Sequence, residues 1–221
     1  VLIIGAGAAG LMAAVGAAET FTRDGVDGRV VVLEKMPRPG RKIMITGKGR
    51  CNFTNVKPWN EFSSHVHPKP NFLKPSFYNL TSEKMVDFLT THGMEAVIER
   101  GDRAFPASHL ASDVVDALVK AAEQAGAEVL CNKEVKEISR QDDGSFHINC
   151  TDGASYACSK LIICTGGLSY PKTGSTGDGY AWAEQMGHSV RPLFPSLTAV
   201  VPRGYKDLST SLEMTKGALE M

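Results

Sequence analysis

The stretch that decides the fold is VLIIGAGAAGLMAAVGAAET at residues 1–20, together with RVVVLE at residues 29–34. Residues 1–4 form a short apolar run, which is typical of a strand buried on both faces of a parallel sheet. The alanine-rich residues 11–20 favour a helix, and residues 29–34 are a second run of β-branched side chains. This order predicts a strand, a tight turn, a helix and a second strand parallel to the first.

The turn between the first strand and the helix carries the pattern G-x-G-x-x-G at Gly5, Gly7 and Gly10. The first glycine makes the turn, the second lets the backbone approach a pyrophosphate, and the third lets the helix pack closely on the strand. Exposed N–H groups at the positive end of the helix dipole would bind that pyrophosphate. Glu34 ends the second strand, where a carboxylate accepts hydrogen bonds from an adenosine ribose and disfavours a 2′-phosphate. The pattern predicts binding of FAD or NAD rather than NADP; glycines that serve packing alone are the alternative.

Composition excludes several classes of protein. The 221 residues contain 24 basic and 24 acidic side chains, so the net charge is zero. That balance argues against broad electrostatic binding to nucleic acid or to anionic membranes, although it leaves room for a local patch. The five cysteines include no C-x-x-C pair, which is typical of free thiols in the cytoplasm and not of disulfides or a zinc site. Residues 1–18 approach the length of a membrane span, but their glycines and the absence of a preceding basic segment argue against a span or a signal peptide.

The remaining segments complete an α/β pattern. Residues 36–55 are expected to form a long functional loop with at most a short helix, and residues 56–76 an irregular surface excursion rich in proline. The pattern predicts a helix that is capped by Ser82 and runs to about residue 92, and a second helix over 111–125. It also predicts strands over 128–131, 135–139, 146–150, 155–158 and 161–164. The predicted fold class is therefore a Rossmann-like domain with a central parallel sheet and a small antiparallel β-meander.

Two features favour FAD over NAD. A second glycine-bearing turn follows the late strand, at residues 161–167, and a basic loop that could run along a diphosphate follows Glu34. The sequence shows no second G-x-G-x-x-G that follows a strand, so no dedicated NAD(P) domain is expected, and reduced nicotinamide would bind only transiently.

Three stretches carry a resemblance to a known family: GRKIMITGKGRCNFTN at 40–55, RGDRAFPASHLASDVVDA at 100–117 and LIICTGGLSYPKTGSTGDGY at 161–180. They resemble signature stretches of the HI0933-like or BaiN-like family of FAD-dependent flavoproteins, within the wider group that includes fumarate reductases. The resemblance implies an FAD-dependent oxidoreductase that reduces an unsaturated organic substrate with electrons from NAD(P)H. For one branch of the family it implies reduction of a conjugated enone on a steroid-like substrate.

The resemblance also assigns residues to the cofactor. It implies that the pyrophosphate is held by Gly5, Gly7, Ala9 and Gly10, and the adenosine ribose by Glu34. Arg41 and Lys42 would lie near the phosphates or the ribityl chain. Val135 would pair its backbone with the adenine, and Thr165 and Gly166 would pass close to the cofactor. Residues 176–179 (TGDG) would lie beside the flavin. The family's chains are longer, so residues 1–195, with an excursion over 56–80, are expected to form the FAD-binding domain, and residues 196–221 to begin an inserted substrate or cap domain.

Several roles stay open at this point. Cys51 is either a redox thiol beside the flavin or a residue packed beneath it, and Tyr170 and Lys172 are either proton donors or surface residues. The pair His65 and His67 lacks further ligands at a metal-binding spacing, so no metal is expected.

Alternatives to the oxidoreductase are a non-catalytic flavin- or nucleotide-binding module and, less favoured, an FAD-dependent RNA-modifying enzyme. Neutral charge and the lack of a basic and aromatic pattern argue against the latter. The expected partner is a small-molecule substrate, with no nucleic acid and no membrane; the sequence indicates neither a catalytic residue nor an oligomeric state.

Overall fold

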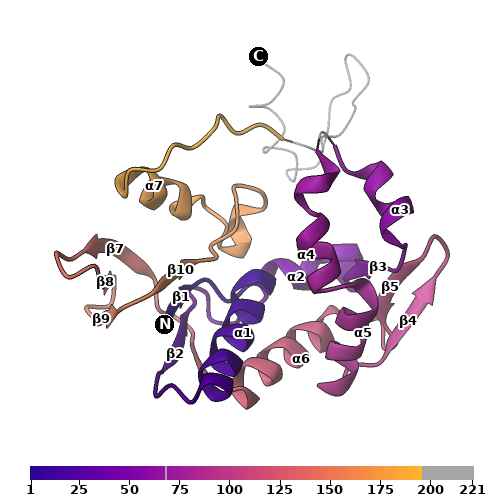
Figure 1. Ribbon diagram of the computed structural model, residues 1–221, viewed down its shortest axis with the longest axis horizontal. Coiled ribbons are helices and arrows are strands. Elements are labelled where there is room, and N and C mark those ends of the chain that lie inside the picture. Colours follow the sequence, from indigo (N-terminus) through magenta and orange to yellow (C-terminus); the bar gives the residue numbers. More distant parts are fainter. Residues whose placement is uncertain (68, 196–221) are drawn as a thin grey trace, which may run out of the picture.

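Four parallel strands form the centre of the computed structural model, which describes residues 1–67 and 69–195 (Figure 1). Their order across the sheet is β10 (Leu161–Ile163), β1 (Leu2–Ile4), β2 (Val30–Leu33) and β6 (Ala127–Leu130). The chain therefore moves outward from β1 to β2 and β6 and then returns to the other side of β1 at β10. Strands that diverge in this way leave a crevice at their carboxyl ends, between β1 and β10. The predicted fold class, α/β with a central parallel sheet, is confirmed.

Both faces of this sheet are apolar, which explains why its strands read as continuous hydrophobic runs. Side chains at alternate positions, such as Ile3 and Val32, pack against the helices α1 (Ala8–Asp24) and α6 (Ala111–Gln124). Their neighbours, such as Ile4 and Leu33, point to the opposite face. Burying each aliphatic side chain of this size stabilises the fold by about 1.5–3 kcal/mol.

The opposite face of the sheet is covered by the predicted meander and a final helix. The meander consists of β7 (Val135–Arg140), β8 (Phe146–Cys150) and β9 (Ser155–Cys158), and the helix is α7 (Asp178–Gln185), preceded by the short turn η4 (Pro171–Thr173). Trp182 of α7 and Ile148 of β8 are buried in one cluster with Leu33 of the central sheet. This cluster fixes α7 beside the carboxyl ends of the parallel strands.

A second antiparallel sheet was not predicted from the sequence. It pairs β3 (Thr54–Asn55) and β4 (Ala96–Glu99) with β5 (Arg103–Pro106), next to α5 (Ser82–Thr91). These strands have two to four residues, too few to produce a clear alternating pattern. The predicted helix cap is also wrong, because Thr81 and not Ser82 accepts the hydrogen bond from the N–H group of Lys84, at 3.3 Å.

Residues 36–55 agree with the expected loop that contains a short helix, whereas residues 56–80 are more helical than expected. The loop after β2 contains α2 (Arg41–Ile45) and η1 (Thr46–Gly49). The excursion expected to be irregular contains α3 (Trp59–Phe62), η2 (Ser63–His65), η3 (Pro70–Phe72) and α4 (Lys74–Asn79). Trp59 and Phe77, whose ring centroids lie 5.2 Å apart, hold these short turns together. These helices are stabilised by aromatic contacts with other segments. Single turns are too short to show helical periodicity, so the sequence did not predict them.

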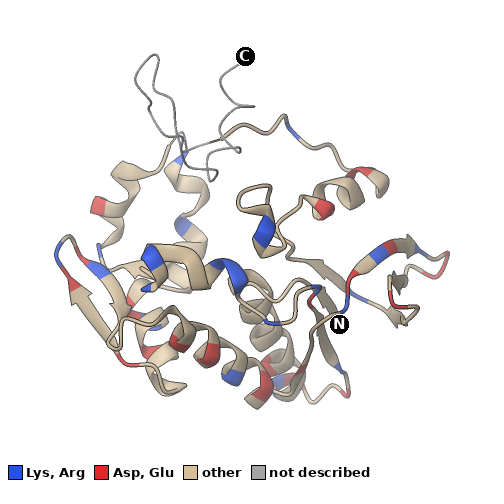
Figure 2. Ribbon diagram, turned by 180° about the vertical axis from the view of Figure 1, so that it is seen from behind, with Lys and Arg blue, Asp and Glu red and all other residues tan. Residues whose placement is uncertain are grey.

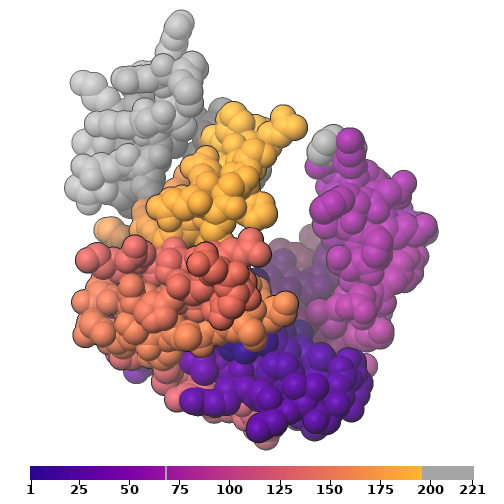
Figure 3. All heavy atoms as spheres, turned by 60° about the vertical axis from the view of Figure 1, so that its left-hand side comes forward, coloured from indigo at the N-terminus to yellow at the C-terminus, as the bar shows by residue number. Residues whose placement is uncertain are grey.

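The excursion and α7 stand on opposite sides of a deep hollow, which is visible between the magenta and yellow atoms in Figure 3. The floor of the hollow is formed around α1 and α2 (Figures 1 and 3). The predicted cap domain, residues 196–221, lies outside the described residues.

Candidate functional site

A cavity of about 670 Å³ opens at the carboxyl ends of β1, β2 and β10, whose last residues Ile4, Leu33 and Ile163 form part of its wall. Further parts of its wall come from the turn after β1, the α2–η1 segment, α6, and residues 165–178. Of the ten residues predicted to contact a cofactor, nine line this cavity: Gly5, Gly7, Ala9, Glu34, Arg41, Lys42, Val135, Thr165 and Gly166. The fold therefore gathers into one cavity residues from segments up to 161 positions apart in the sequence.

Gly5 and Gly10 are required by the packing of the protein itself. Gly5 has a φ of +100°, and a Cβ there would lie 2.5 Å from the carbonyl oxygen of Cys164. A Cβ on Gly10 would lie 1.8 Å from the carbonyl oxygen of Gly5. Gly10 accordingly lies behind the turn, where it lets α1 approach β1, and it is the one predicted residue outside the cavity lining.

Gly7 is different, because nothing in the described part of the chain requires a glycine there. Its φ of −80° is open to any residue, and no described atom lies within 4 Å of the position of a Cβ. Gly7 is also the residue that precedes α1, and no described side chain caps that helix end. A Cβ at this position would stand in the cavity beside the unpaired N–H groups of the first helical turn. The space that glycine leaves open here can hold an anionic group that binds to these backbone N–H groups.

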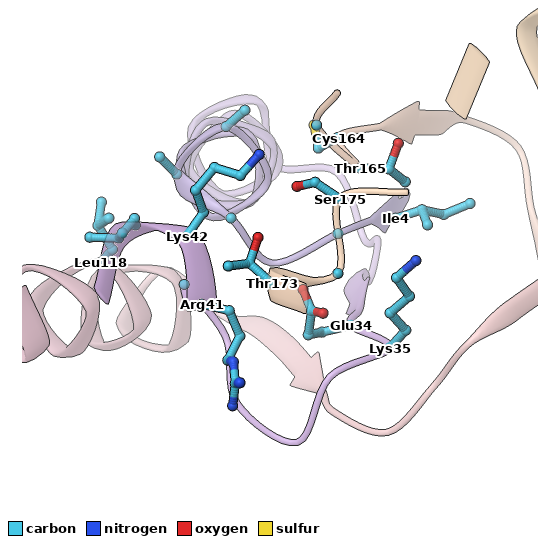
Figure 4. Close-up of a pocket in the computed structure, with 18 of the residues that line it drawn as sticks. Ile4, Glu34, Lys35, Arg41, Lys42, Leu118, Cys164, Thr165, Thr173 and Ser175 are labelled. Atoms are coloured by element: carbon cyan, nitrogen blue, oxygen red, sulfur yellow. The ribbon is translucent and has the colours of Figure 1, made fainter. Parts of the chain in front are cut away.

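Glu34 is held at the cavity wall by two backbone N–H groups. Its Oε2 accepts a hydrogen bond from the N–H of Ala6 at 2.8 Å, and its Oε1 accepts one from Met36 at 2.9 Å. An ionised carboxylate has acceptor sites for about four hydrogen bonds, so it keeps capacity for a hydroxyl of a bound group. Figure 4 shows its side chain between those of Thr173 and Lys35.

Arg41 and Lys42 leave α2 in opposite directions (Figure 4). The Nζ atom of Lys42 donates a hydrogen bond to the hydroxyl of Ser169, 3.2 Å away, on the loop after β10. Burial lowers the pKa of this lysine from its usual value. Two walls of the cavity therefore meet at this contact.

The wall formed by residues 165–178 is held against the end of β2. Lys35 donates hydrogen bonds from Nζ to Oγ1 of Thr176 at 2.6 Å and to Oδ2 of Asp178 at 2.7 Å. Behind this wall, a Cβ on Gly179 would lie 2.5 Å from the hydroxyl of Thr165, so the helix α7 can approach β10 only at a glycine. The close approach explains the second glycine of the TGDG stretch.

The sequence analysis left other lining residues without a role. They include Lys35, Thr46, Asn52, Phe53, Lys133 and Ser175. Several lie within the quoted stretches 40–55 and 161–180, so the stretches indicated the site although the single residues were not assigned. Val114 of α6 lies within the third quoted stretch, 100–117. Lys133, Met85 of α5 and Leu118 of α6 lie outside all three stretches, and only the packing of the chain brings them to the cavity.

The positions and burial of Cys51, Tyr170 and Lys172 bear on the roles that the sequence left open for them. Cys51 lines the cavity with 4% of its surface exposed, and burial raises the pKa of its thiol, which favours packing over redox chemistry. Tyr170 and Lys172 do not line the cavity, and both are exposed.

Among residues 1–67 and 69–195, no three His, Cys, Asp or Glu side chains lie together as metal ligands. No helix in that same part of the chain is both long and apolar enough to cross a membrane.

The family model described as the HI0933-like protein Rossmann domain matches residues 1–221. The chain belongs to this family. The resemblance expected from residues 40–55, 100–117 and 161–180 is confirmed. The expectation of an enzyme is likewise supported, because the curated relatives of this HI0933-like chain are named as enzymes.

Two curated relatives illustrate this similarity. The chain is 34% identical to the ribosomal RNA dihydrouridine synthase of Escherichia coli over 191 residues, which are 86% of this chain and 45% of the relative. It is 31% identical to the 3-dehydro-bile acid delta(4,6)-reductase of Clostridium scindens over 195 residues, 88% of this chain and 46% of the relative. The HI0933-like chain thus spans about half the length of these relatives.

A solved structure agrees with the fold. The 3-ketosteroid-delta4-(5alpha)-dehydrogenase of Rhodococcus jostii, in complex with 4-androstene-3,17-dione, superimposes with a TM-score of 0.53 and 16% sequence identity. The match covers 76% of this chain and 46% of that one. At this identity the similarity supports the fold alone.

Proposed function

We propose that this chain is the FAD-binding part of an oxidoreductase that reduces a carbon–carbon double bond conjugated to a carbonyl group. The observation that carries the proposal is the open position beside Gly7, at the uncapped start of α1, within a cavity that also presents the fixed carboxylate of Glu34. A dinucleotide needs both features, an anion site for its pyrophosphate and an acceptor for its ribose hydroxyls.

The relatives support the reaction type, since their two named activities share one kind of chemistry. A delta(4,6)-reductase of a 3-dehydro-bile acid acts on double bonds conjugated to the 3-keto group. Dihydrouridine is uridine in which the double bond between C5 and C6, conjugated to the C4 carbonyl, has been saturated. In both reactions a hydride adds to the end of the conjugated double bond that is farther from the carbonyl, and a proton adds to the nearer end. Reduced FAD supplies hydride in reactions of this kind.

The residues of this chain bind and orient the cofactor. Ala8 and Ala9, at the start of α1, would direct backbone N–H groups to the pyrophosphate, and Glu34 would accept from the ribose. Arg41 and Lys42 would supply positive charge to the phosphates or ribityl chain, and Thr165 and Gly166 would contact the cofactor from β10. Val135, the first residue of β7, would pair its backbone with the adenine. Cys51, as a buried neutral thiol, would pack against the bound group without reacting.

Reduced nicotinamide remains our predicted electron donor, and it would bind transiently. Two substrates fit this reaction. The sequence favours a small apolar molecule over a uridine in RNA. A non-catalytic binding module is the alternative if the chain binds FAD without exchanging electrons.

The visible absorption spectrum of the purified 221-residue chain tests the proposal, followed by chromatography of any released cofactor. We expect flavin absorption and release of FAD. Substituting Gly7→Ala should weaken FAD binding by roughly tenfold or more, since one lost or lengthened hydrogen bond to a phosphate costs about 1.4 kcal/mol.

The matched control is Gly16→Ala, in the same helix, where a Cβ likewise has no described atom within 4 Å. This control should leave FAD affinity unchanged. A folded, colourless chain that does not bind added FAD would overturn the proposal, and so would equal FAD affinity in the Gly7→Ala variant and the wild type.

A further inference from the structure

The segment that follows α2 is held in a costly conformation at the wall of the cavity. Four of the residues 47–51 have left-handed backbone angles, with φ between +55° and +86°. Two of them, Lys48 and Cys51, carry side chains, for which this conformation is unfavourable. Such strain persists only where surrounding contacts fix the backbone, and it is frequent at binding sites.

Backbone contacts on both sides of Asn52 fix this segment. Before it, the N–H of Cys51 donates to the carbonyl oxygen of Thr46 at 3.1 Å. After it, the N–H of Phe53 donates to the carbonyl oxygen of Ala104 in β5, also at 3.1 Å. Asn52 therefore has a fixed position at the cavity, which it lines.

The amide group of Asn52 is fixed as well. Its Nδ2 donates hydrogen bonds to the carbonyl oxygens of Thr54 at 3.0 Å and of Ala104 at 3.2 Å. In the opposite orientation Oδ1 would face the same two carbonyl oxygens, and an acceptor cannot bond to an acceptor. Both amide hydrogens are used in this way, so the side chain can offer only its oxygen to a molecule in the cavity.

Thr46, which lines the same wall, is restricted in a similar way. Its hydroxyl donates to the carbonyl oxygen of Ile43 at 2.7 Å, so toward a ligand it can only accept. Residues 36–55 contain no Asp or Glu, and the α2–η1 segment is blue and tan, without red, in Figure 2. No carboxylate of this segment therefore competes with Asn52 and Thr46 as an acceptor.

These acceptors lie away from the part of the cavity that would bind the adenosine half of FAD. Val135, at the start of β7, would meet the adenine, and Figure 1 shows α1 and α2 between β7 and β3. A dinucleotide whose ribose meets Glu34 and whose pyrophosphate meets the start of α1 would therefore direct its second half toward Asn52. The side chain of Phe53 makes the wall beside Asn52 partly apolar.

An acceptor in a partly apolar wall suits a flat ring with an N–H donor at its edge. The isoalloxazine ring of FAD has such a donor, the imide N–H. An acceptor that is removed from water and left unpaired costs free energy, so it discriminates against a ligand without the matching donor.

We propose that Asn52 is a specificity-determining residue for the cofactor, and that its Oδ1 accepts a hydrogen bond from the imide N–H of the isoalloxazine ring. This inference rests on the proposed function, because it states how the same cavity recognises the flavin half of FAD. The sequence gave Asn52 no role, since the orientation of its amide depends on a carbonyl group of the distant strand β5.

Titration of the full chain, freed of bound flavin, with FAD and with 3-methyl-FAD tests the proposal. The analogue carries a methyl group in place of the imide hydrogen, and flavin fluorescence follows binding. The wild type should bind FAD about tenfold more tightly than the analogue. In Asn52→Ala the affinity for FAD should fall about tenfold, and the affinities for the two flavins should agree within about twofold.

Asn55→Ala is the matched control. The amide of Asn55 is also fixed by the backbone, since Nδ2 donates to the carbonyl oxygen of Gly101 at 2.9 Å and Oδ1 accepts from the N–H of Lys57 at 3.0 Å. Asn55 does not line the cavity, so this variant should keep both the FAD affinity and the preference of the wild type. Circular dichroism checks that each variant is folded.

A second measurement needs no variant. An acceptor bound to the imide N–H stabilises the neutral form of the imide, so bound FAD should lose this proton at a higher pH than free FAD. The absorption spectrum of the bound flavin as a function of pH reports the ionisation.

Three results would overturn the proposal: equal binding of FAD and 3-methyl-FAD by the wild type, an unchanged preference in Asn52→Ala, or ionisation of bound FAD at the same pH as free FAD. Each of them leaves the proposed function standing, because FAD is still bound. A folded chain that binds neither flavin refutes the proposed function and this inference together.

Discussion

Lys35, which follows β2, is hydrogen-bonded to Asp178 at the start of α7, with 2.7 Å between Nζ and Oδ2. The two residues are 143 positions apart in the sequence, and both line the cavity. Thr176 completes the contact, because its hydroxyl accepts from Lys35 at 2.6 Å and donates to the other carboxylate oxygen of Asp178 at 2.8 Å. This contact fastens one wall of the cavity to the sheet.

Replacing Lys35 with methionine should destabilise the protein by about 1 kcal/mol at neutral pH. Burial acts to raise the pKa of Asp178, but the hydrogen bonds from Lys35 and Thr176 outweigh it and lower that pKa below its usual value. A lowered pKa means that the ionised pair stabilises the protein above the usual aspartate pKa. That stabilisation is lost as the pH falls through the lowered value.

Urea unfolding of the wild type and Lys35→Met as a function of pH measures this effect. The difference in the free energy of unfolding should shrink in acid. The control Lys160→Met, at an exposed lysine directly before β10, should match the wild type throughout. A difference that does not change with pH would show that the pair contributes no charge-dependent stability.

Gly10→Ala should destabilise the fold by about 3 kcal/mol or more, since its Cβ would overlap the carbonyl oxygen of Gly5 and force α1 away from β1. Gly16→Ala in the same helix should instead stabilise it by up to about 1 kcal/mol, because alanine favours the helix and the Cβ meets no described atom there. Thermal unfolding distinguishes the two. A Gly10→Ala variant as stable as the wild type would contradict the close packing of α1 on β1.

Alkylation of Cys51 should be slow and should accelerate only above the usual cysteine pKa. Burial raises the pKa of this thiol, and a contact with Thr46 lowers it by less, so the reactive thiolate forms at higher pH. Peptide-resolved mass spectrometry after iodoacetamide treatment at a series of pH values measures the rate. Rapid modification of the folded chain at neutral pH would support the redox role. In line with packing, Cys51→Ala should retain FAD.

Arg50→Lys should cost about 1 kcal/mol, although it keeps the charge. The guanidinium of Arg50 lies 4.3 Å from the ring centroid of Phe105 while it pairs with Glu99, and an ammonium cannot stack and pair in the same way. Arg50→Met should cost more, about 1–3 kcal/mol, because it leaves the carboxylate of Glu99 without its partner.

A double-mutant cycle with Glu99→Gln, followed by urea unfolding, tests the coupling between Arg50 and Glu99. The double variant should lose less stability than the sum of the two single variants. Additive losses would indicate that the two side chains act independently.

The cofactor-binding part of the fold could be predicted because its signals are local. The turn from Gly5 to Gly10 lies within six consecutive residues, and the strands around it alternate their side chains between two apolar faces. Glu34 could be assigned because it directly follows a recognisable strand. The second antiparallel sheet and the short helices of residues 56–80 could not be predicted in this way, since segments of two to six residues carry too little periodicity.

The sequence by itself determined the βαβ unit, the glycine turn and the family, because each depends on neighbouring residues in a fixed order. Only the tertiary structure decided which distant segments share the cavity. Pairing β10 with β1 brings residues 165–178 beside Lys35 and α2, and so builds both the contact between Lys35 and Asp178 and the hydrogen bond from Lys42 to Ser169. Local sequence patterns could not reveal these two contacts, because their partners lie 143 and 127 positions apart and are brought together only when the strands pair.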